Sequence, residues 1–341
     1  MTMDYVMKAR SRTAARELDA ALRRFEPRVA AAFLAAAKAV RSRAVLREIA
    51  RAIERGDLER AVELTGAGRL AAGLRGAGLD PGARTVQAEL IDAFRRGGTA
   101  GMRQFPRAAG IAASLDLTNP EAVLYLRDHV PALIRQVGAE AREAVRQALA
   151  RGMTEGRPAI LIAREIRDAV DLTAAQSHYV GNLRRQLETG DVGNATAPWD
   201  RRLSAVERQR ARSIMSAGGE RSTRVDALVS RYHDSLVNRR ARNIARTEVH
   251  RAFVEGQDEL WRQATAEGLI DPATTRRVWI VTPDDRLRPD HAAVPGMNPS
   301  GVALGEQFQT PVGPVDGPGQ SGDPAFDIGC RCTTALEFRD L

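Results

Sequence analysis

The sequence predicts a mainly α-helical protein, with an elongated helical N-terminal and central region followed by a small C-terminal α+β domain. Three observations support this fold class. Apolar residues recur at spacings of three and four through most of the chain up to Glu267, which is typical of amphipathic helices. Alanine dominates the apolar residues and aromatic residues make up only 4%, so we expect thin helical packing. The last segment instead holds β-branched residues, most of the prolines and both cysteines.

Residues 1–118 are predicted to form a basic helical N-terminal region. Residues 3–64 read as two or three helices, with Leu18, Leu22 and Phe25 on one apolar face. Pro27 marks either a kink or the start of a new helix, because proline lacks the backbone N–H that a helix interior uses.

Glycine-rich stretches divide this first region. Residues 66–82 indicate a flexible hinge or loop. Asp80 and Pro81 are typical of the N-cap and first position of a helix, which we expect to run to Arg96. Residues 97–119 then predict a second glycine-rich connection.

Residues 119–237 are predicted to form a central helical region. Asn119 and Pro120 begin a helix that continues to about Arg151, and Thr173 caps another that runs to Glu188. Between them, Pro158 begins a short helix. Its predicted buried residues are Ile160, Ile162, Ile166 and Val170. The clearest loop is 190–199, and it is followed by helices at 201–216 and 223–236.

Residues 238–341 are predicted to form the C-terminal α+β domain. Its helix, 239–267, keeps an apolar stripe over about seven turns. The segment 277–282 (RVWIVT) is β-branched and aromatic and therefore predicts a strand. We expect one further strand near Phe308 and a final alternating strand at 331–338.

The charge of the chain is unevenly distributed. The net charge is +8, composed of +8 in residues 1–120, +4 in 121–268 and −4 in 269–341. A basic body suits an acidic partner such as nucleic acid or an acidic protein surface, although a solvated basic surface is the alternative. The candidate contact residues lie in the first helices and are Arg16, Arg23, Arg24, Arg28, Arg41, Arg43 and Arg47.

The two cysteines exclude a disulfide framework. The first 25 residues carry charges throughout, so we expect no signal peptide, and the longest apolar run is too short to cross a bilayer. We therefore expect a protein of the reducing cytoplasm with no membrane partner.

Three motifs occur in a fixed order in the last part of the chain. The first is IARTEVHRAF, which holds Arg246, Thr247 and Glu248. The second is VWIVTPDDRLRPDH, which holds Thr282, Asp285, Arg286, Arg288 and His291. The third is Cys330-Arg331-Cys332. Over residues 220–338 this arrangement resembles the phage Mu F-like minor head proteins, which include the SPP1-type head morphogenesis proteins.

The resemblance implies a role in phage head assembly. Members of that family associate with the portal protein, are enclosed in the procapsid in few copies, and in some cases contact packaged double-stranded DNA. Scaffold and capsid proteins are further implied partners. The implied location is the host cytoplasm during assembly and then the virion interior near the portal vertex. We expect the signature residues to be structural, with Arg246 and Glu248 joining the helix to the C-terminal strands.

The sulfur and imidazole groups of the last motifs are candidate metal ligands. Cys330 and Cys332 lie two apart on an expected strand, so their thiols face the same side, and His291 is the natural third ligand for Zn²⁺. The family pattern has histidine where this chain has Asp327, which makes Asp327 a fourth candidate. Buried reduced thiols without metal, or redox-active thiols, are the alternatives.

The acidic residues beside His291 allow an enzymatic alternative. Asp284, Asp285 and Asp290 with His291 are residue types that a metal-dependent nuclease or toxin-like effector needs. The negative charge of the segment disfavours a site for a polyanion. We therefore expect Asp285 to form loop salt bridges with Arg286 or Arg288, with His291 capping a turn, and we expect no catalytic residues.

Overall fold

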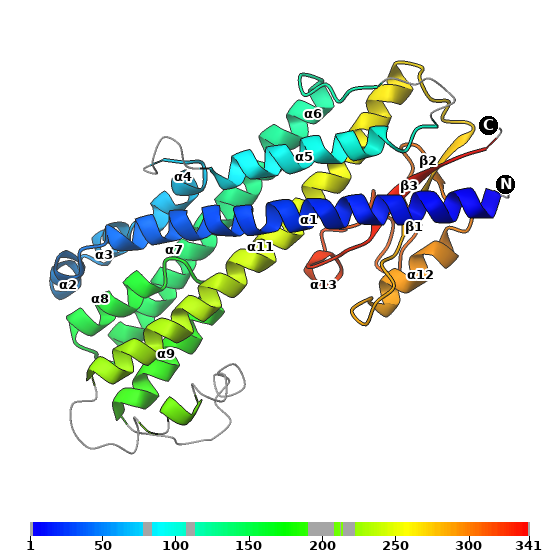
Figure 1. Ribbon diagram of the computed structural model, residues 1–341. Coiled ribbons are helices and arrows are strands. Elements are labelled where there is room, and N and C mark those ends of the chain that lie inside the picture. Colours follow the sequence, from blue (N-terminus) through cyan, green and yellow to red (C-terminus); the bar gives the residue numbers. More distant parts are fainter. Residues whose placement is uncertain are drawn as a thin grey trace. The chain divides into compact units, whose positions relative to one another are not determined.

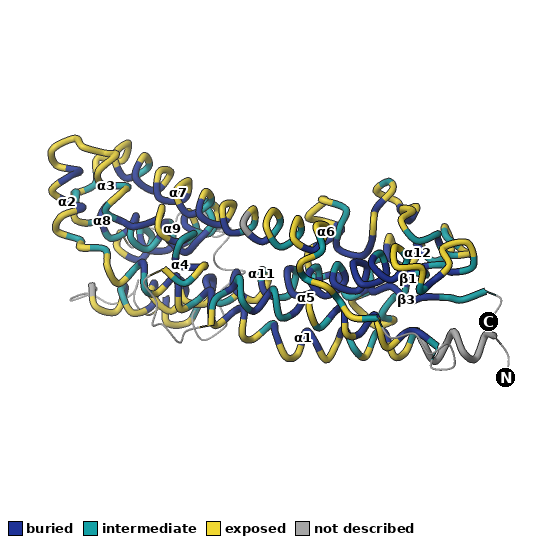
Figure 2. Tube along the Cα trace, turned by 90° about the horizontal axis from the view of Figure 1, so that it is seen from above, coloured by how far each residue is buried: buried dark blue, intermediate teal, exposed yellow. Residues whose placement is uncertain are grey.

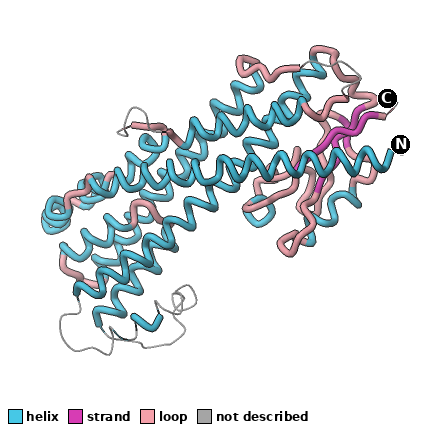
Figure 3. Tube along the Cα trace, in the orientation of Figure 1, coloured by secondary structure: helices cyan, strands magenta, loops and turns pink. Residues whose placement is uncertain are grey.

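The computed structural model describes residues 3–77, 84–106, 113–189, 208–211, 213 and 222–339. Within these ranges the chain is mostly helical, and a small three-stranded antiparallel sheet lies in the C-terminal part (Figures 1 and 3). The predicted fold class, mainly α with a small C-terminal α+β part, is therefore confirmed. None of the described helices combines the length and the apolar character that a membrane span needs.

The chain divides into two compact units, each assembled from separated segments. Unit 1 consists of Met1–Ala31, Arg84–Pro131 and Arg242–Leu341. Unit 2 consists of Ala32–Ala83 and Ala132–Ala241. The segments predicted from the sequence are consecutive, whereas two long helices, α1 (Met3–Ser42) and α11 (Ser222–Ala266), each contribute to both units.

Unit 1 contains the sheet and the helices that cover it. Its other helical elements are α5 (Val86–Met102), α6 (Pro120–Leu124), the π-helical segment η3 (Tyr125–His129), α12 (Pro289–Met297) and α13 (Pro324–Asp327). Its strands are β1 (Thr275–Ile280), β2 (Val302–Ala303) and β3 (Thr333–Phe338), in the order β2-β1-β3. In the antiparallel register, Arg277 pairs with Val302 on one side and with Leu336 on the other.

Unit 2 is built from helices. They are α2 (Leu46–Glu54), α3 (Leu58–Thr65), the short 3₁₀ segment η1 (Ala67–Arg69), α4 (Leu70–Leu74), α7 (Val130–Thr154), α8 (Ala159–Asp168) and α9 (Ala174–Thr189). Figure 2 shows α7 alternating between buried and exposed residues along its length. Its buried residues include Ile134, Val137, Ala141, Val145 and Ala148, whose three-to-four spacing is that of one helix face.

Close backbone contact between α5 and α11 organises unit 1. A Cβ atom added to Gly97 would lie 1.9 Å from the carbonyl oxygen of Phe253. A Cβ atom added to Gly256 would lie 1.9 Å from the carbonyl oxygen of Phe94. Each helix therefore presents a glycine to the backbone of the other, and this allows an approach that any side chain would prevent.

This contact explains where one prediction was wrong. The stretch 97–119 was expected to be a glycine-rich connection, but α5 continues to Met102. Its glycines serve helix packing rather than a turn. The start of α5 also differs from the prediction, because Thr85 is the N-cap and its side chain accepts a hydrogen bond from the N–H of Ala88 at 3.0 Å. Asp80 and Pro81 lie outside the described residues.

Other expected helix ends are absent. α1 continues through Pro27, and apolar side chains on both sides of it, including Phe25 and Val29, are buried. The two helices expected at 223–236 and 239–267 form the single helix α11. Residues 66–82 were expected to be a loop, but Leu70–Leu74 form α4. In each case burial of an apolar face outweighs a local signal for interruption.

Two details of side-chain burial and strand position also differ. In α8, Ile162 and Ile166 are buried as predicted, but Ile160 is 40% exposed because it lies at the start of the helix on the opposite face. Phe308 forms only an isolated bridge with Val315, and the second strand lies at Val302–Ala303. The loop 190–199 and most of 201–216 lie outside the described residues.

Strand β3 does not alternate between buried and exposed residues. Thr333, Thr334, Ala335 and Leu336 are all buried. The backbone N–H of Leu336 donates to Oε1 of Gln104 at 2.9 Å, and the hydroxyl of Thr333 lies 3.2 Å from Oε1 of Gln257. Side chains from α11 and from the residues after α5 therefore cover this edge strand, which removes the exposed face that an alternating pattern needs.

Candidate metal centre

Three metal-binding side chains meet in unit 1. His291 lies on α12, and Cys330 and Cys332 lie just before β3. All three residues are buried, and one nitrogen and the two sulfur atoms lie within 4.8 Å of one another. This is the one group of that kind among the described residues, and it could hold a metal ion.

The orientation of His291 fits a metal ligand. Its Nε2 donates to the carbonyl oxygen of Phe326 at 3.0 Å, so Nδ1 faces the sulfur atoms. Such a hydrogen bond from the second ring nitrogen is the usual way in which a metal-binding histidine is oriented. Nδ1 lies 3.4 Å from Sγ of Cys332 and 3.6 Å from Sγ of Cys330. Tetrahedral Zn²⁺ with ordinary bond lengths holds nitrogen and sulfur ligands about 3.5 Å apart.

The thiols of Cys330 and Cys332 differ in pKa. The hydrogen bond with Cys330 lowers the pKa of Cys332 to about 5. The same hydrogen bond, together with burial, raises the pKa of Cys330. One sulfur is therefore a thiolate at neutral pH while the other keeps its proton. A divalent cation would displace that proton and neutralise both sulfurs.

Space beside the cluster is limited to about one small ligand. A cavity of about 20 Å³ is lined by His291, Cys330 and Cys332 together with Thr282, Arg286, Leu287, Arg288, Gly329 and Arg331. A single water molecule needs about 10–15 Å³ measured in this way. The cavity thus has room for a fourth ligand such as water.

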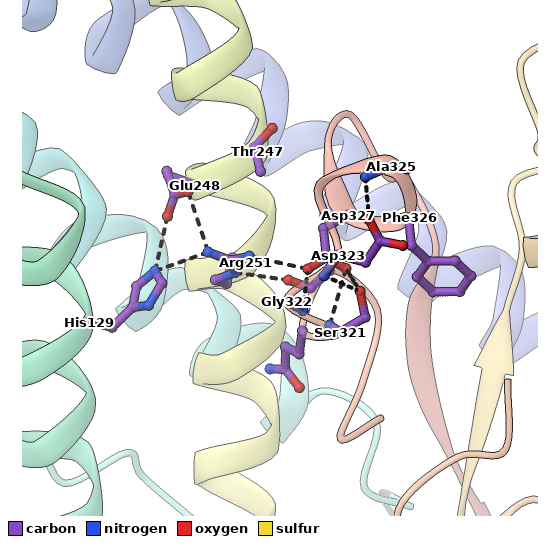
Figure 4. Close-up of polar contacts among 12 residues, drawn as sticks. His129, Thr247, Glu248, Arg251, Ser321, Gly322, Asp323, Ala325, Phe326 and Asp327 are labelled. Atoms are coloured by element: carbon purple, nitrogen blue, oxygen red, sulfur yellow. Dashed lines mark hydrogen bonds and ion pairs between the residues drawn. The ribbon is translucent and has the colours of Figure 1, made fainter. Parts of the chain in front are cut away.

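Asp327 does not belong to the cluster, contrary to the prediction. Its Oδ1 accepts hydrogen bonds from the backbone N–H and the hydroxyl of Ser321 at 3.1 and 2.8 Å. Its Oδ2 accepts from the N–H of Gly322 at 2.9 Å and pairs with Arg251 at 3.4 Å (Figure 4). The carboxylate is engaged in holding the loop before α13, so it is not free to complete a metal site.

The signature residues of α11 hold the C-terminal segment in place, but not as predicted. Oγ1 of Thr247 accepts a hydrogen bond from the N–H of Gly329 at 3.3 Å. Glu248 instead pairs with His129 at 3.0 Å and with Arg251 at 3.5 Å (Figure 4). Arg246 is half-buried, and no hydrogen bond or ion pair joins it to the residues that the structure describes. The expected Arg246 and Glu248 link to the strands is therefore absent.

Other residues of α11 make that link, and sequence reasoning missed them. Nε of Arg251 donates to the carbonyl oxygen of Gly319 at 2.8 Å. Asp258 pairs with Arg277 of β1 at 3.3 Å, and both side chains are buried. The available signal was the spacing of Glu248, Arg251 and Asp258 along α11, a helix that carries many charged residues. Periodicity alone does not distinguish such buried ion pairs from a solvated face.

His250 joins α11 directly to the candidate metal centre. Its Nε2 donates to the carbonyl oxygen of Cys332 at 2.7 Å, and the ring is fully buried. Burial disfavours the charged imidazolium and lowers the pKa of His250 to about 4. The folded protein therefore holds this histidine neutral.

This lowered pKa predicts acid sensitivity. Stability from a neutral buried histidine is fully present above the unfolded pKa of about 6.5 and is lost as the pH falls toward 4. Between pH 7.5 and pH 4, we expect the free energy of unfolding of unit 1 to fall by about 3 kcal/mol more in the wild-type protein than in the His250→Gln variant. Urea unfolding at several pH values measures the difference. Equal losses in the two proteins would show that His250 is not held neutral.

The acidic and basic residues of the motif VWIVTPDDRLRPDH (residues 278–291) form ion pairs that differ in part from those expected. Asp284, not Asp285, forms the ion pair, and its partner is Arg331. The N–H of Arg286 donates to the same carboxylate at 2.9 Å, and Asp285 is exposed. Nη1 of Arg288 donates to the carbonyl oxygen of Phe326 at 3.1 Å. His291 is buried in the cluster and does not cap an exposed turn.

The N-terminal arginines fall into different environments. Arg16, Arg23, Arg24 and Arg28 are exposed on the part of α1 that belongs to unit 1. Arg43 and Arg47 are also exposed. Arg41 is only partly exposed, and its guanidinium lies 2.7 Å from Nδ1 of His233 and 3.6 Å from Asp171. Arg41 is therefore engaged inside unit 2.

Searches of the chain against protein-family models, curated proteins and solved structures found no match.

Proposed function

We propose that this chain is a phage minor head protein that attaches to the portal protein during assembly of the procapsid. The observation that carries the proposal is the way in which the three signature segments contact one another. Thr247 contacts Gly329 at 3.3 Å, and the hydroxyl of Thr282 donates to the carbonyl oxygen of Arg331 at 2.8 Å. His291 then lies against Cys332. The residues that carry the resemblance therefore support one another in a single module.

The proposed role is non-catalytic. The cavity beside His291 and the cysteines, at about 20 Å³, is too small for a nucleotide. Asp284 is occupied by its ion pair with Arg331. These features favour a module that stabilises the chain and presents binding surfaces. Incubation of the protein with DNA and Mg²⁺ separates this role from that of a nuclease. Cleavage that His291→Ala abolishes would overturn the proposal.

Within this role we propose a structural Zn²⁺ held by His291, Cys330 and Cys332, with a water molecule as the fourth ligand. The ion would supply positive charge that neutralises two buried thiolates and would cross-link α12 to the segment before β3. Support comes from the nitrogen–sulfur distances of 3.4 and 3.6 Å and from the orientation of His291 by Phe326. No chemical step depends on this ion.

We further propose that α1 contacts packaged DNA through Arg16, Arg23, Arg24 and Arg28. These four residues are exposed, and arginine is well suited to phosphate recognition. Each phosphate contact releases counterions, so binding weakens steeply with salt. Replacement of all four by alanine should weaken DNA binding and reduce the slope of log K against log salt by about 0.9 per lost contact.

A filter-binding or anisotropy assay at several salt concentrations measures this slope. The matched control replaces four exposed arginines of unit 2, namely Arg55, Arg75, Arg231 and Arg239. An equal change in the control would assign the effect to total charge rather than to α1. Absence of binding at both low and physiological salt would remove DNA from the proposed partners.

The portal protein of the same phage is the principal proposed partner, and co-purification with it is the test of the attachment. The proposal places the chain in the host cytoplasm during assembly and inside the virion near the portal vertex afterwards. Scaffold and capsid proteins remain secondary proposed partners.

A further inference from the structure

Unit 2 contains a polar cavity that the proposed head function does not use. Its volume is about 530 Å³, within the range of about 300–1,000 Å³ that small-ligand sites occupy. It is lined by Lys38, Arg41, Ser42, Arg164, Arg167, Asp168, Arg184, Asp226, Ser230 and His233. These residues come from α1, α8, α9 and α11, and all belong to unit 2.

The lining is positively charged. Five lysine and arginine side chains face two carboxylates, Asp168 and Asp226, and two serine hydroxyls add neutral donors. Carboxylates outside the lining also contact these cations. They are Glu188 at 3.5 Å from Arg184, and Asp171 and Asp234 at 3.6 and 3.7 Å from Arg41. The five cations equal these five carboxylates in number. Only two of the carboxylates lie in the lining, so the surface that faces the cavity carries more positive than negative groups.

The existing ion pairs orient the guanidinium groups without using all of their donors. Arg184 is buried and contacts both Asp226, at 2.5 Å, and Glu188 through Nη1. Arg164 contacts Asp226 at 3.5 Å, also through Nη1. Arg167 contacts Asp168 through Nε and Nη2. Since a guanidinium has five N–H donors on three nitrogens, each of these arginines keeps a nitrogen outside these ion pairs.

Lys38 and His233 complete the cavity in different ways. Lys38 is exposed, and no hydrogen bond or ion pair joins it to the described residues, so its ammonium can turn toward a ligand. His233 is buried and held at Nε2 by Asp171 at 2.8 Å and by the carbonyl oxygen of Asp168 at 3.0 Å. A fixed wall and a movable cation suit the capture of a compact anion.

We propose that this cavity binds the diphosphate or triphosphate group of a small molecule, such as pyrophosphate or a nucleoside triphosphate. Arginine presents parallel N–H groups that match the oxygens of a phosphate. Arg164, Arg167 and Arg184 supply such groups around the cavity, and Lys38 adds a mobile positive charge. A chain of two or three phosphates spreads its charge over several of these groups at once. This function is independent of portal attachment.

A duplex phosphate fits the cavity less well. Arg184 is only 6% exposed, so its donors lie within the recess. A phosphodiester of double-stranded DNA is flanked by sugars on a convex surface, and it cannot enter a recess of this kind. The terminal phosphates of a small molecule have no such flanking groups on one side.

Isothermal titration calorimetry of the full chain tests the proposal. The titrants are pyrophosphate, a nucleoside triphosphate and the corresponding nucleoside without phosphate. We expect saturable binding at one site for the two phosphates and none for the nucleoside. Equal affinities would assign recognition to two phosphates alone, whereas tighter triphosphate binding would add contacts with the third phosphate or with the nucleoside. Both results support the site.

Variants locate the binding. Lys38→Ala and Arg164→Ala should each weaken binding about tenfold or more, because each removes a charged hydrogen bond to the ligand. Arg75→Ala, which changes an exposed arginine of unit 2 outside the cavity, should bind as the wild-type protein does. Lys38 is exposed and the described residues do not pair with it, so Lys38→Ala should fold normally.

Three results would overturn the proposal. The first is absence of saturable binding of pyrophosphate and triphosphate at millimolar concentration. The second is an equal loss of affinity in Arg75→Ala and in the cavity variants. The third is displacement of bound pyrophosphate by short duplex DNA, which would make DNA the ligand of this surface.

Discussion

Replacement of Gly97 or Gly256 by alanine is expected to destabilise unit 1 by roughly 3 kcal/mol or more, at the upper end of the cost of overpacking a core. The added methyl group at Gly97 would lie 1.9 Å from the carbonyl oxygen of Phe253, and that at Gly256 would lie 1.9 Å from that of Phe94. The obstructing atoms belong to helix backbones, so they cannot rotate away as a side chain does. The helices α5 and α11 must separate instead.

Gly296 provides the matched control for these variants. It also lies in a helix of unit 1, α12, but a Cβ atom added there meets nothing within 4 Å. Gly296→Ala should be neutral or stabilise the protein by up to about 1 kcal/mol through helix propensity. Chemical denaturation followed by circular dichroism measures all three variants. Stabilities of Gly97→Ala and Gly256→Ala that match the Gly296→Ala result would contradict the close backbone contact.

Removal of metal is the second change for which we expect a large effect. The purified protein should contain about one zinc ion per chain, bound by His291, Cys330 and Cys332. Zinc at a thousand times its dissociation constant stabilises the folded state by about 4 kcal/mol. Chelation should therefore lower the Tm of unit 1 by about 10 °C. Trp279, whose ring centroid lies 6.4 Å from that of His291, provides a fluorescence signal close to the site.

Variants distinguish this site from adventitious zinc. Cys330→Ala, Cys332→Ala and His291→Ala should each lose the ion and the response to chelator. Asp327→Asn should keep the ion, because Asp327 bonds to Ser321, Gly322 and Arg251 rather than to the cluster. Elemental analysis of the purified wild-type protein and of each variant measures how much zinc each one binds. Zinc absent from the wild-type protein, or retained in all the cluster variants, would leave two buried reduced thiols as the correct description.

The sequence was sufficient to predict the fold class and most of the main elements, although α4 was expected to be a loop and a strand was expected near Phe308. The apolar stripe of α11, the Asn119–Pro120 helix start and the β-branched strand near Val278 are strong local signals, and the structure has the corresponding elements. The glycines of α5 were misread, because glycine favours both a turn and a close helix contact. Only the partner helix, distant in sequence, decides between them.

The candidate site was predictable in part for a similar reason. His291, Cys330 and Cys332 were all predicted and do lie together, although the two cysteines lie just before β3 and not on the strand that was expected to place their thiols on one side. Asp327 was expected among them, but its carboxylate faces the N–H groups of a loop, which sequence spacing does not reveal. Arg251 and Asp258 were missed because a buried ion pair on a helix has the same local pattern as a solvated one.

The central proposal is that the chain attaches to a phage portal protein, and co-expression with such a portal protein tests it most directly. The measurement is native mass spectrometry of the complex after gel filtration, combined with elemental analysis of the same sample. We predict that the chain elutes with the assembled portal in a defined small number of copies, each with about one zinc ion. A chain that elutes alone while the portal assembles normally would contradict the account.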